Sequence, residues 1–67
     1  MPYSSNDELP KSVRNNLPEH AQAIYRKAFN RALAQYQQEE RAHKVAWSAV
    51  EQEYEKTASG DWGKKSS

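Results

Sequence analysis

Apolar residues recur every three or four positions between residues 18 and 37, and polar residues fill the positions between them. This spacing is typical of an amphipathic helix, whose apolar side chains form one stripe. Pro18 suits the first turn of a helix, where its missing N–H would have no partner. We therefore predict a helix over residues 18–37. Its apolar stripe consists of Ala21, Ile24, Tyr25, Ala28, Phe29, Ala32, Leu33 and Tyr36.

A shorter helix is predicted over residues 10–16, between two Leu-Pro pairs. Pro10 suits its first position, as Pro18 does in the next helix. The residue before a proline is pushed out of the helical region, so this helix must end close to Asn16. Its apolar face, at four-residue spacing, consists of Leu9, Val13 and Leu17.

A third helical pattern follows over residues 41–56. It has a row of small side chains beside a row of large ones. Small residues let a helix approach a neighbour closely, while the large row fills the adjoining groove. The small row is Ala42, Ala46 and Ala49, and the large row is His43, Trp47, Val50 and Tyr54.

Two arrangements of the second and third helices remain open. Residues 37–41 interrupt the apolar stripe without a glycine or a proline, so both helices could form one long rod that pairs with another chain. A turn there would instead fold the three helices on one another, which gives Ile24, Phe29 and Leu33 partners within the chain. We predict the turn and an all-α fold, a compact three-helix bundle. Its core signature is Leu9, Val13, Leu17, Ile24, Tyr25, Phe29, Trp47, Val50 and Tyr54.

The length of 67 residues allows one domain, which we assign to residues 1–58. Residues 59–67 form a C-terminal tail with a disordered end, in which Trp62 is expected to dock on a surface. The sequence contains no cysteine, which excludes disulfides and thiolate metal sites and fits a reducing compartment. No apolar run is long enough to span a bilayer, and the N-terminus has no leader pattern. We therefore expect a cytoplasmic protein.

The sequence has no recognisable catalytic or cofactor-binding motif. Its serines lie outside a Gly-x-Ser-x-Gly elbow, and two glycines cannot build a phosphate-binding loop. We expect no enzyme activity, no cofactor and no metal. Glu39, Glu40 and His43 lie within one helical turn, and we interpret them as a solvated acidic patch rather than a cation site. His43 is either a core histidine or a pH-sensitive one.

Binding to a partner is the function class that remains. Ten basic and nine acidic residues give a net charge of +1, too balanced to indicate nucleic acid by itself. Lys27 and Arg31 fall on the outward face of the second helix, and Trp62 is an aromatic residue of the kind that anchors interfaces. These three residues are the candidate partner-binding surface. Weak self-association is a further option for so small a core.

Two blocks of the sequence resemble the ChaB family and together cover almost the whole chain. Each Leu-Pro pair alone is uninformative, but the two blocks in this order are highly specific. The first block is Met1-Pro2-Tyr3, then Leu9-Pro10-x-x-Val13, then Leu17-Pro18-x-His20-Ala21-Gln22-x-Ile24-Tyr25-x-x-Ala28-Phe29-Asn30-x-Ala32. The second block is Ala42-His43-Lys44-Val45-Ala46-Trp47-x-Ala49-Val50-x-x-Glu53-Tyr54.

The resemblance implies a compact helical domain whose short extended terminal segments pack together, which would give Tyr3 and Trp62 a contact. It also implies a non-enzymatic regulator of cation transport, because the family is described so after an association with a calcium/sodium–proton antiporter. We therefore expect an adaptor that binds a protein, such as a cation antiporter at its cytosolic face. The alternative is a nucleic-acid-binding accessory protein, since some relatives in large viral genomes are described as DNA-binding.

This chain departs from the family pattern between the two blocks. Many members have a longer charged stretch there than residues 37–41. If that stretch contacts the transporter, this chain would keep the fold without that function.

Overall fold

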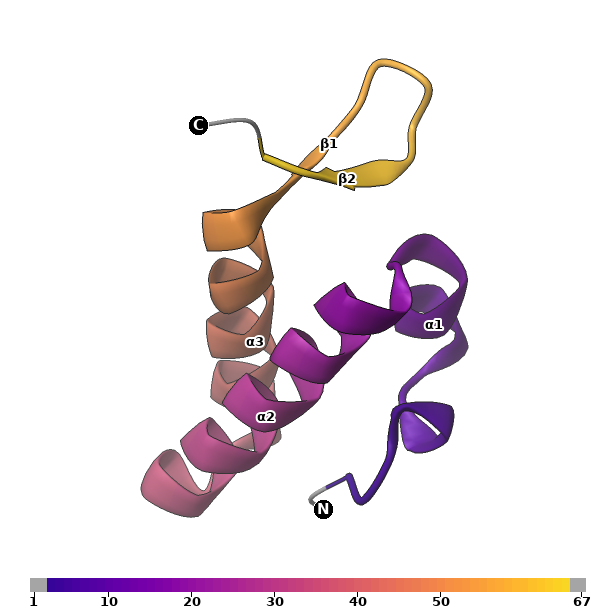
Figure 1. Cartoon of the computed structure of the whole chain (residues 1–67). Coiled ribbons are helices and arrows are strands. Elements are labelled where there is room, and N and C mark those ends of the chain that lie inside the picture. Colours follow the sequence, from indigo (N-terminus) through magenta and orange to yellow (C-terminus); the bar gives the residue numbers. More distant parts are fainter. Residues whose placement is uncertain (1–2, 66–67) are drawn as a thin grey trace.

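A pair of helices, α2 (Glu19–Tyr36) and α3 (Glu39–Glu53), forms the centre of the molecule (Figure 1). The computed structural model of the protein describes residues 3–65. The chain reverses between the helices at Gln37, which has φ 57° and ψ 31°, in the left-handed region. Its N–H donates to the Leu33 carbonyl at 2.8 Å and closes the end of α2. The predicted turn is confirmed, so the alternative of one continuous helix is wrong.

The core is built from rows of residues at four-residue spacing. On α2 and α3 these rows contain alanines that are completely buried, such as Ala21, Ala42 and Ala46. Small side chains at a helix contact bring the two axes close together. The remaining volume is filled by larger residues, of which Tyr25, Phe29 and Val50 are 0 % exposed.

Seven of the nine residues of the predicted core signature are buried, and the other two, Ile24 and Trp47, are half-buried against the core. Both lie on the flanks of the apolar stripe of their helix, away from the line where α2 meets α3. The seven buried residues are Leu9, Val13, Leu17, Tyr25, Phe29, Val50 and Tyr54.

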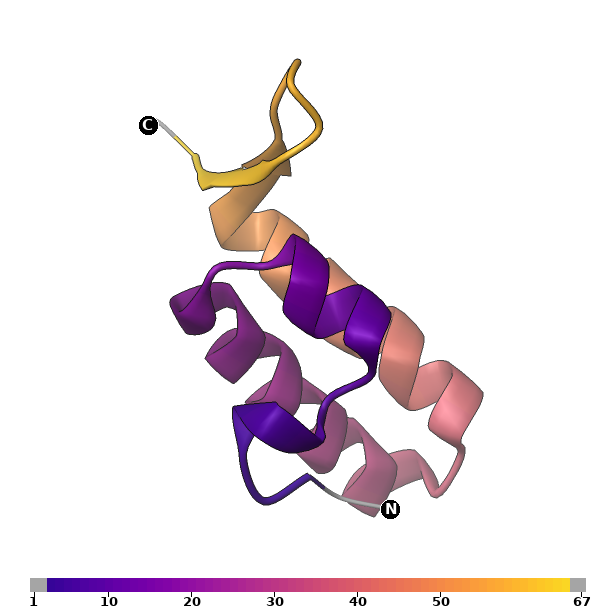
Figure 2. The same cartoon turned by 90° about the vertical axis from the view of Figure 1, so that its right-hand side faces the viewer.

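Helix α1 (Lys11–Asn16) lies across one side of the α2–α3 pair, where Figure 2 shows it in front. Leu17 takes ψ 138° ahead of Pro18, so α1 ends where the second Leu-Pro pair predicts. Before α1 the chain forms a short 3-10 helix, η1 (Asn6–Glu8), within the terminal segment for which the family resemblance implies extended backbone. The local turn is held by backbone hydrogen bonds to the carbonyls of Ser5 and Asn6, at 3.2 and 3.1 Å.

The C-terminal part of the domain is a small hairpin and not a continuation of α3. The third helix ends three residues earlier than predicted, and Tyr54–Lys56 is strand β1, antiparallel to β2 (Trp62–Lys64). The hairpin turn places Gly60 at φ +92°, a conformation that favours glycine. The N–H of Lys65, the residue after β2, donates to the Glu53 carbonyl at 2.8 Å and so ties the end of the hairpin to the end of α3.

The fold is therefore three helices with a small two-stranded sheet, in which the segment assigned to the tail supplies β2. The disordered end predicted for that tail includes residues 66–67, which lie outside the described residues. Met1 and Pro2 of the family pattern lie outside them as well.

Candidate functional site

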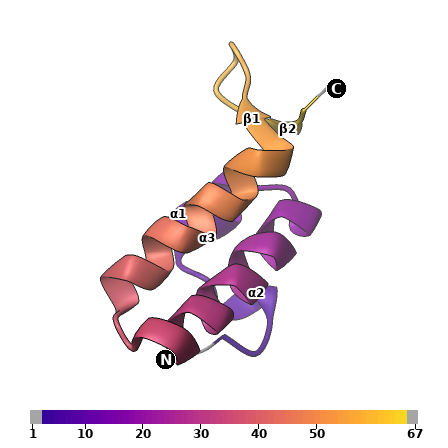
Figure 3. The same cartoon turned by 90° about the vertical axis from the view of Figure 1, so that its left-hand side faces the viewer.

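A groove of about 690 Å³ runs between α2 and α3 on the side away from α1. Figure 3 views the helix pair from this side, with α1 behind it. Every residue that lines the groove belongs to one of the two long helices. They are Ile24, Lys27, Ala28, Arg31, Ala32, Gln35 and Tyr36 from α2, and Val45 and Ala49 from α3.

The groove carries exposed apolar surface. Among residues 3–65, the large hydrophobic side chains that are exposed are Tyr36 (40 %) and Val45 (37 %). Both line the groove, one from each wall. Exposed apolar groups gathered in one concave place, with polar groups at the rim, are characteristic of a binding surface.

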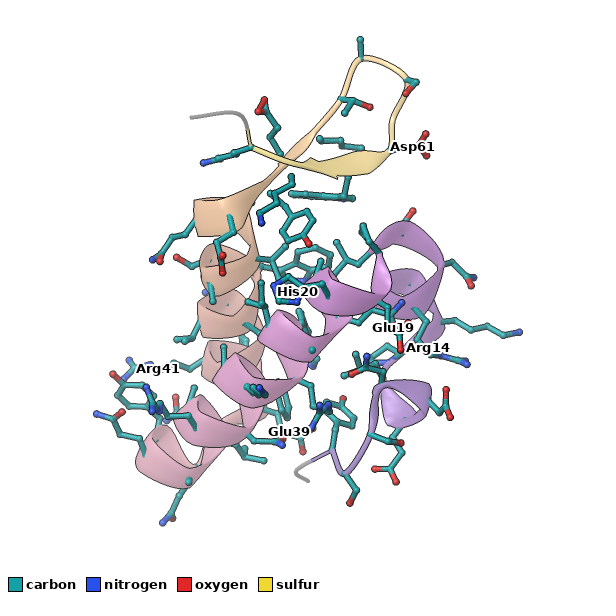
Figure 4. All side chains as sticks on the ribbon, in the orientation of Figure 1. Arg14, Glu19, His20, Glu39, Arg41 and Asp61 are labelled. Atoms are coloured by element: carbon teal, nitrogen blue, oxygen red, sulfur yellow. The ribbon has the colours of Figure 1, made fainter. Side chains whose placement is uncertain are left out.

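The rim of the groove is positively charged. Its nine lining residues include two cations, Lys27 and Arg31, and no carboxylate. A third cation is close, because the Arg41 guanidinium carbon lies 4.9 Å from the centre of the Tyr36 ring. Figure 4 shows Arg41 at the end of the helix pair where α2 and α3 join, on the side opposite Arg14.

Helical geometry explains why Glu40 and Glu51 of α3 are absent from this rim. At about 100° per residue, Arg41 falls on the Val45 side of α3. Glu40 and Glu51 fall roughly 120–140° around the helix from Val45. These two carboxylates therefore do not offset the positive charge at the rim of the groove.

The third member of the candidate partner-binding surface, Trp62, lies elsewhere. Its ring centroid is 5.7 Å from that of Trp47, and Trp47 in turn meets Tyr25 edge-on at 5.3 Å. This aromatic cluster lies on the other flank of α3 from the groove. The structure thus brings Lys27 and Arg31 together in one site and separates Trp62 from them.

His43 is placed on the same flank as the aromatic cluster. Its Nδ1 forms a hydrogen bond with the Tyr25 hydroxyl, and its ring centroid is 4.8 Å from that of Phe29. Burial, with a smaller contribution from Tyr3, raises the pKa of Tyr25 to about 12. Since this phenol stays protonated at neutral pH, its O–H can donate to Nδ1 of the neutral imidazole. His43 serves as the partner of a buried hydroxyl.

Sequence reasoning missed Asn30, which joins the N-terminal segment to α2. Its Oδ1 accepts from the Tyr3 N–H at 2.8 Å, and its Nδ2 donates to the Tyr3 carbonyl at 2.8 Å. The Tyr3 ring packs on Phe29 with centroids 4.8 Å apart. Burial raises the pKa of Tyr3, and the Glu39 carboxylate raises it further. Asn30 was identified from the sequence only as a residue of the first family block, and its position between apolar helix residues gives no indication of the contact with Tyr3.

A second contact holds the same segment. Arg26 Nε donates to Asn6 Oδ1 at 2.9 Å, and Asn6 Nδ2 donates to the Glu19 carbonyl at 3.3 Å. Together these contacts cover the flank of α2 that faces away from the groove. The opposite flank, with Ile24 and Lys27, stays open.

Two further features bear on the kinds of site available. Within residues 3–65, no three His, Cys, Asp or Glu side chains are grouped so that they could hold a metal ion. No helix of this described part has both the length and the apolar character that crossing a bilayer requires.

Comparison with known proteins places the chain beside one group. The sequence model of the ChaB family matches residues 9–65. An Escherichia coli K12 protein named "Putative cation transport regulator ChaB" is 49 % identical over 76 aligned positions, covering 98 % of this chain and all of the relative. A Shigella flexneri protein of the same name matches equally. The aligned positions outnumber the 67 residues here, so the relatives contain residues that this chain lacks.

The fold is similar to a solved structure as well. The solution NMR structure of a protein with that same name superposes with a TM-score of 0.87 at 48 % identity, covering 97 % of this chain and all of the other.

Proposed function

The chain belongs to the ChaB family, and from this premise we propose that it is a non-enzymatic regulatory domain of cation transport that acts by binding a protein. The name of its relatives supports a role in the regulation of cation transport. The groove between α2 and α3 supports the mode of action. The observation that carries the proposal is that Tyr36 and Val45, the exposed large hydrophobic residues of the described chain, both line that groove.

A regulator that catalyses no reaction can act on a transporter only through the free energy of binding to it. It shifts a transporter between conformations only as far as it binds one of them more tightly than the other. An apolar groove with a charged rim provides both affinity and orientation for such a contact.

The proposed partner is a cation antiporter, contacted at its cytosolic face by a protein located in the cytoplasm. The absence of cysteine from the sequence fits this reducing location. Lys27, Arg31 and the apolar floor of the groove between α2 and α3 would make this contact. Trp62 on the hairpin is a separate candidate contact.

Transport by a purified calcium/sodium–proton antiporter in proteoliposomes tests this function. Proton flux would be followed with a pH-sensitive dye while the purified domain is added at increasing concentration. We expect a saturable change in the transport rate. A Lys11→Glu variant, altered at an exposed position on α1, serves as the control and should act like the native domain.

The alternative function is binding to nucleic acid, and the salt dependence of binding distinguishes it from the regulatory function. Phosphate contacts release counterions, so affinity for a DNA duplex should fall steeply and linearly on a logarithmic scale of salt. An unchanged transport rate at every domain concentration, together with salt-dependent DNA binding, would replace the regulatory function by the nucleic-acid one.

A further inference from the structure

The shape of the α2–α3 groove is matched to a helix. Four of its lining residues on α2 follow the spacing i, i+4, i+7, i+11, which spans about 17 Å or three turns. They are Ile24, Ala28, Arg31 and Gln35. The floor is built largely from alanine, so it leaves room for side chains that enter from outside. A long groove with an apolar floor accepts the apolar face of an amphipathic helix.

The walls supply apolar contacts at both sides. Tyr36 and Val45 keep 40 % and 37 % of their surface exposed. An incoming helix with apolar residues at i, i+3 or i+4, and i+7 would cover both, since such residues form one stripe. The opposite side of the helix pair offers no equivalent space, because α1 and the Tyr3 segment already cover it.

The positive charges around the groove indicate which kind of helix it would bind. Lys27 and Arg31 stand on the α2 wall, and Arg41 stands beside Tyr36 at the loop end of the groove. A guanidinium stacked on an aromatic ring still presents its N–H groups at the edge for a carboxylate. Three cations around a groove without a lining carboxylate complement an acidic segment and repel a basic one.

We propose that this groove binds an acidic amphipathic helix of the partner protein, about three turns long. Apolar side chains of that helix enter between α2 and α3, and carboxylates on its flanks pair with Lys27, Arg31 and Arg41. This inference rests on the proposed function and specifies the segment of the partner that the site recognises.

A designed peptide is the probe. It has about 14 residues, leucine at the positions of one apolar stripe, glutamate on both flanks, and fluorescein at one end. A second peptide carries lysine in place of every glutamate. Binding is measured by fluorescence anisotropy at low and at physiological ionic strength. The native domain is expected to bind the acidic peptide and to bind the basic peptide at least about tenfold more weakly.

Charge reversal in the groove supplies the specific test. In a Lys27→Glu, Arg31→Glu double variant the preference should invert, so that the basic peptide binds at least about tenfold more tightly than the acidic one. Lys11→Glu with Lys56→Glu is the matched control, since both side chains are exposed and neither lines the groove. The control should retain the native preference. Helical circular dichroism and thermal melting verify that each variant is folded.

Other results would overturn the inference. One such result is that the native domain does not bind the acidic peptide. Another is that the native domain and the double variant bind this peptide equally, and a third is that the control variant loses binding as much as the double variant does. A groove occupied by a second copy of the chain would also overturn it. That result would appear as a dimer in sedimentation, broken by Val45→Glu and not by the acidic peptide. Groove-dependent binding to anionic vesicles or to DNA that the peptide fails to displace would do the same.

The transport assay distinguishes this inference from the function on which it rests. If the native domain changes antiporter flux and the folded double variant does so equally, the groove is not the contact and the regulatory function stands. If the native domain has no effect on flux, the regulatory function fails whatever the peptide does. If only the folded double variant loses the effect on flux, its peptide preference is inverted, and excess acidic peptide relieves the effect of the native domain by competing for the groove, then the groove is the contact with the transporter.

Discussion

The side-chain amide of Asn30 forms two hydrogen bonds with the backbone of Tyr3, one in each direction and both 2.8 Å long. An amide group paired this way imitates the edge of a β-strand. It holds a segment 27 residues away in the chain against the middle of α2. This contact closes one side of the α2–α3 pair and leaves the groove on the other side open.

Asn30→Ala should destabilise the protein by about 1–2 kcal/mol. Losing both hydrogen bonds costs more than the gain of roughly 0.5 kcal/mol from the higher helix propensity of alanine. Asn15→Ala, at an exposed position of α1, is the control and should leave stability unchanged or slightly higher. Urea unfolding followed by circular dichroism measures the free energy of each variant. Equal effects in both variants would show that the Tyr3 contact contributes nothing.

The native state should lose stability as the pH rises from 10 to 12. The pKa of Tyr25 is raised from 10.0 to about 12, so the unfolded state releases this proton before the native state does. The stabilisation is complete below pH 10 and is lost on approaching pH 12, by roughly 2 kcal/mol. Urea unfolding between about pH 8 and pH 11.5 would detect the onset.

Two variants assign this pH dependence. Tyr25→Phe removes the titrating group, so the fall above pH 10 should be smaller and should come from other tyrosines such as Tyr3. Tyr36→Phe, at a tyrosine with 40 % of its surface exposed, is the matched control for the loss of a phenol. An identical fall in Tyr25→Phe and the native protein would contradict the assignment.

Gln37→Gly should stabilise the protein by about 0.5–1 kcal/mol. The left-handed conformation, in which glycine commonly ends a helix, costs a residue with a Cβ atom about 1–2 kcal/mol, and the extra backbone entropy that glycine loses on folding offsets roughly half of this. Gln38→Gly is the comparison, because Gln38 has φ −131° and ψ 118°, an ordinary extended conformation. That change should destabilise through the greater entropy of the unfolded chain. Thermal melting of the two variants should therefore shift in opposite directions.

Trp62→Ala should destabilise the protein by about 2 kcal/mol, a part of the cost of deleting a fully buried tryptophan. Removing the ring uncovers Trp47, whose fluorescence should shift to longer wavelength. Asp61→Ala changes an exposed neighbour on the hairpin and should leave the emission unchanged. An unshifted emission in Trp62→Ala would mean that the contact between the two tryptophans is not formed in solution.

The positions of the helices could be predicted from sequence because their causes are local. The spacing of apolar residues specifies α2 and α3, and the two Leu-Pro pairs specify both ends of α1. The last turn of the third helix was mispredicted for the same reason. Tyr54 continues the apolar spacing of α3, but its backbone is extended with φ −128° and ψ 156°, because the following residues pair with Trp62–Lys64. That pairing joins segments whose sequence carries no signal for it.

The candidate site shows the same division. Lys27 and Arg31 could be named from the sequence as an outward cationic face of the second helix. The sequence does not show which flank of the second helix is covered by the rest of the chain. Ile24 and Leu33 lie on opposite flanks of its apolar stripe, and both are apolar. Contacts between distant segments decide this: Tyr3 contacts Asn30 on one flank of α2, while Ile24 on the other flank lines the groove together with Val45 of α3. Helix formation is a matter of neighbours in the chain, whereas an open binding face depends on which neighbours in space are missing.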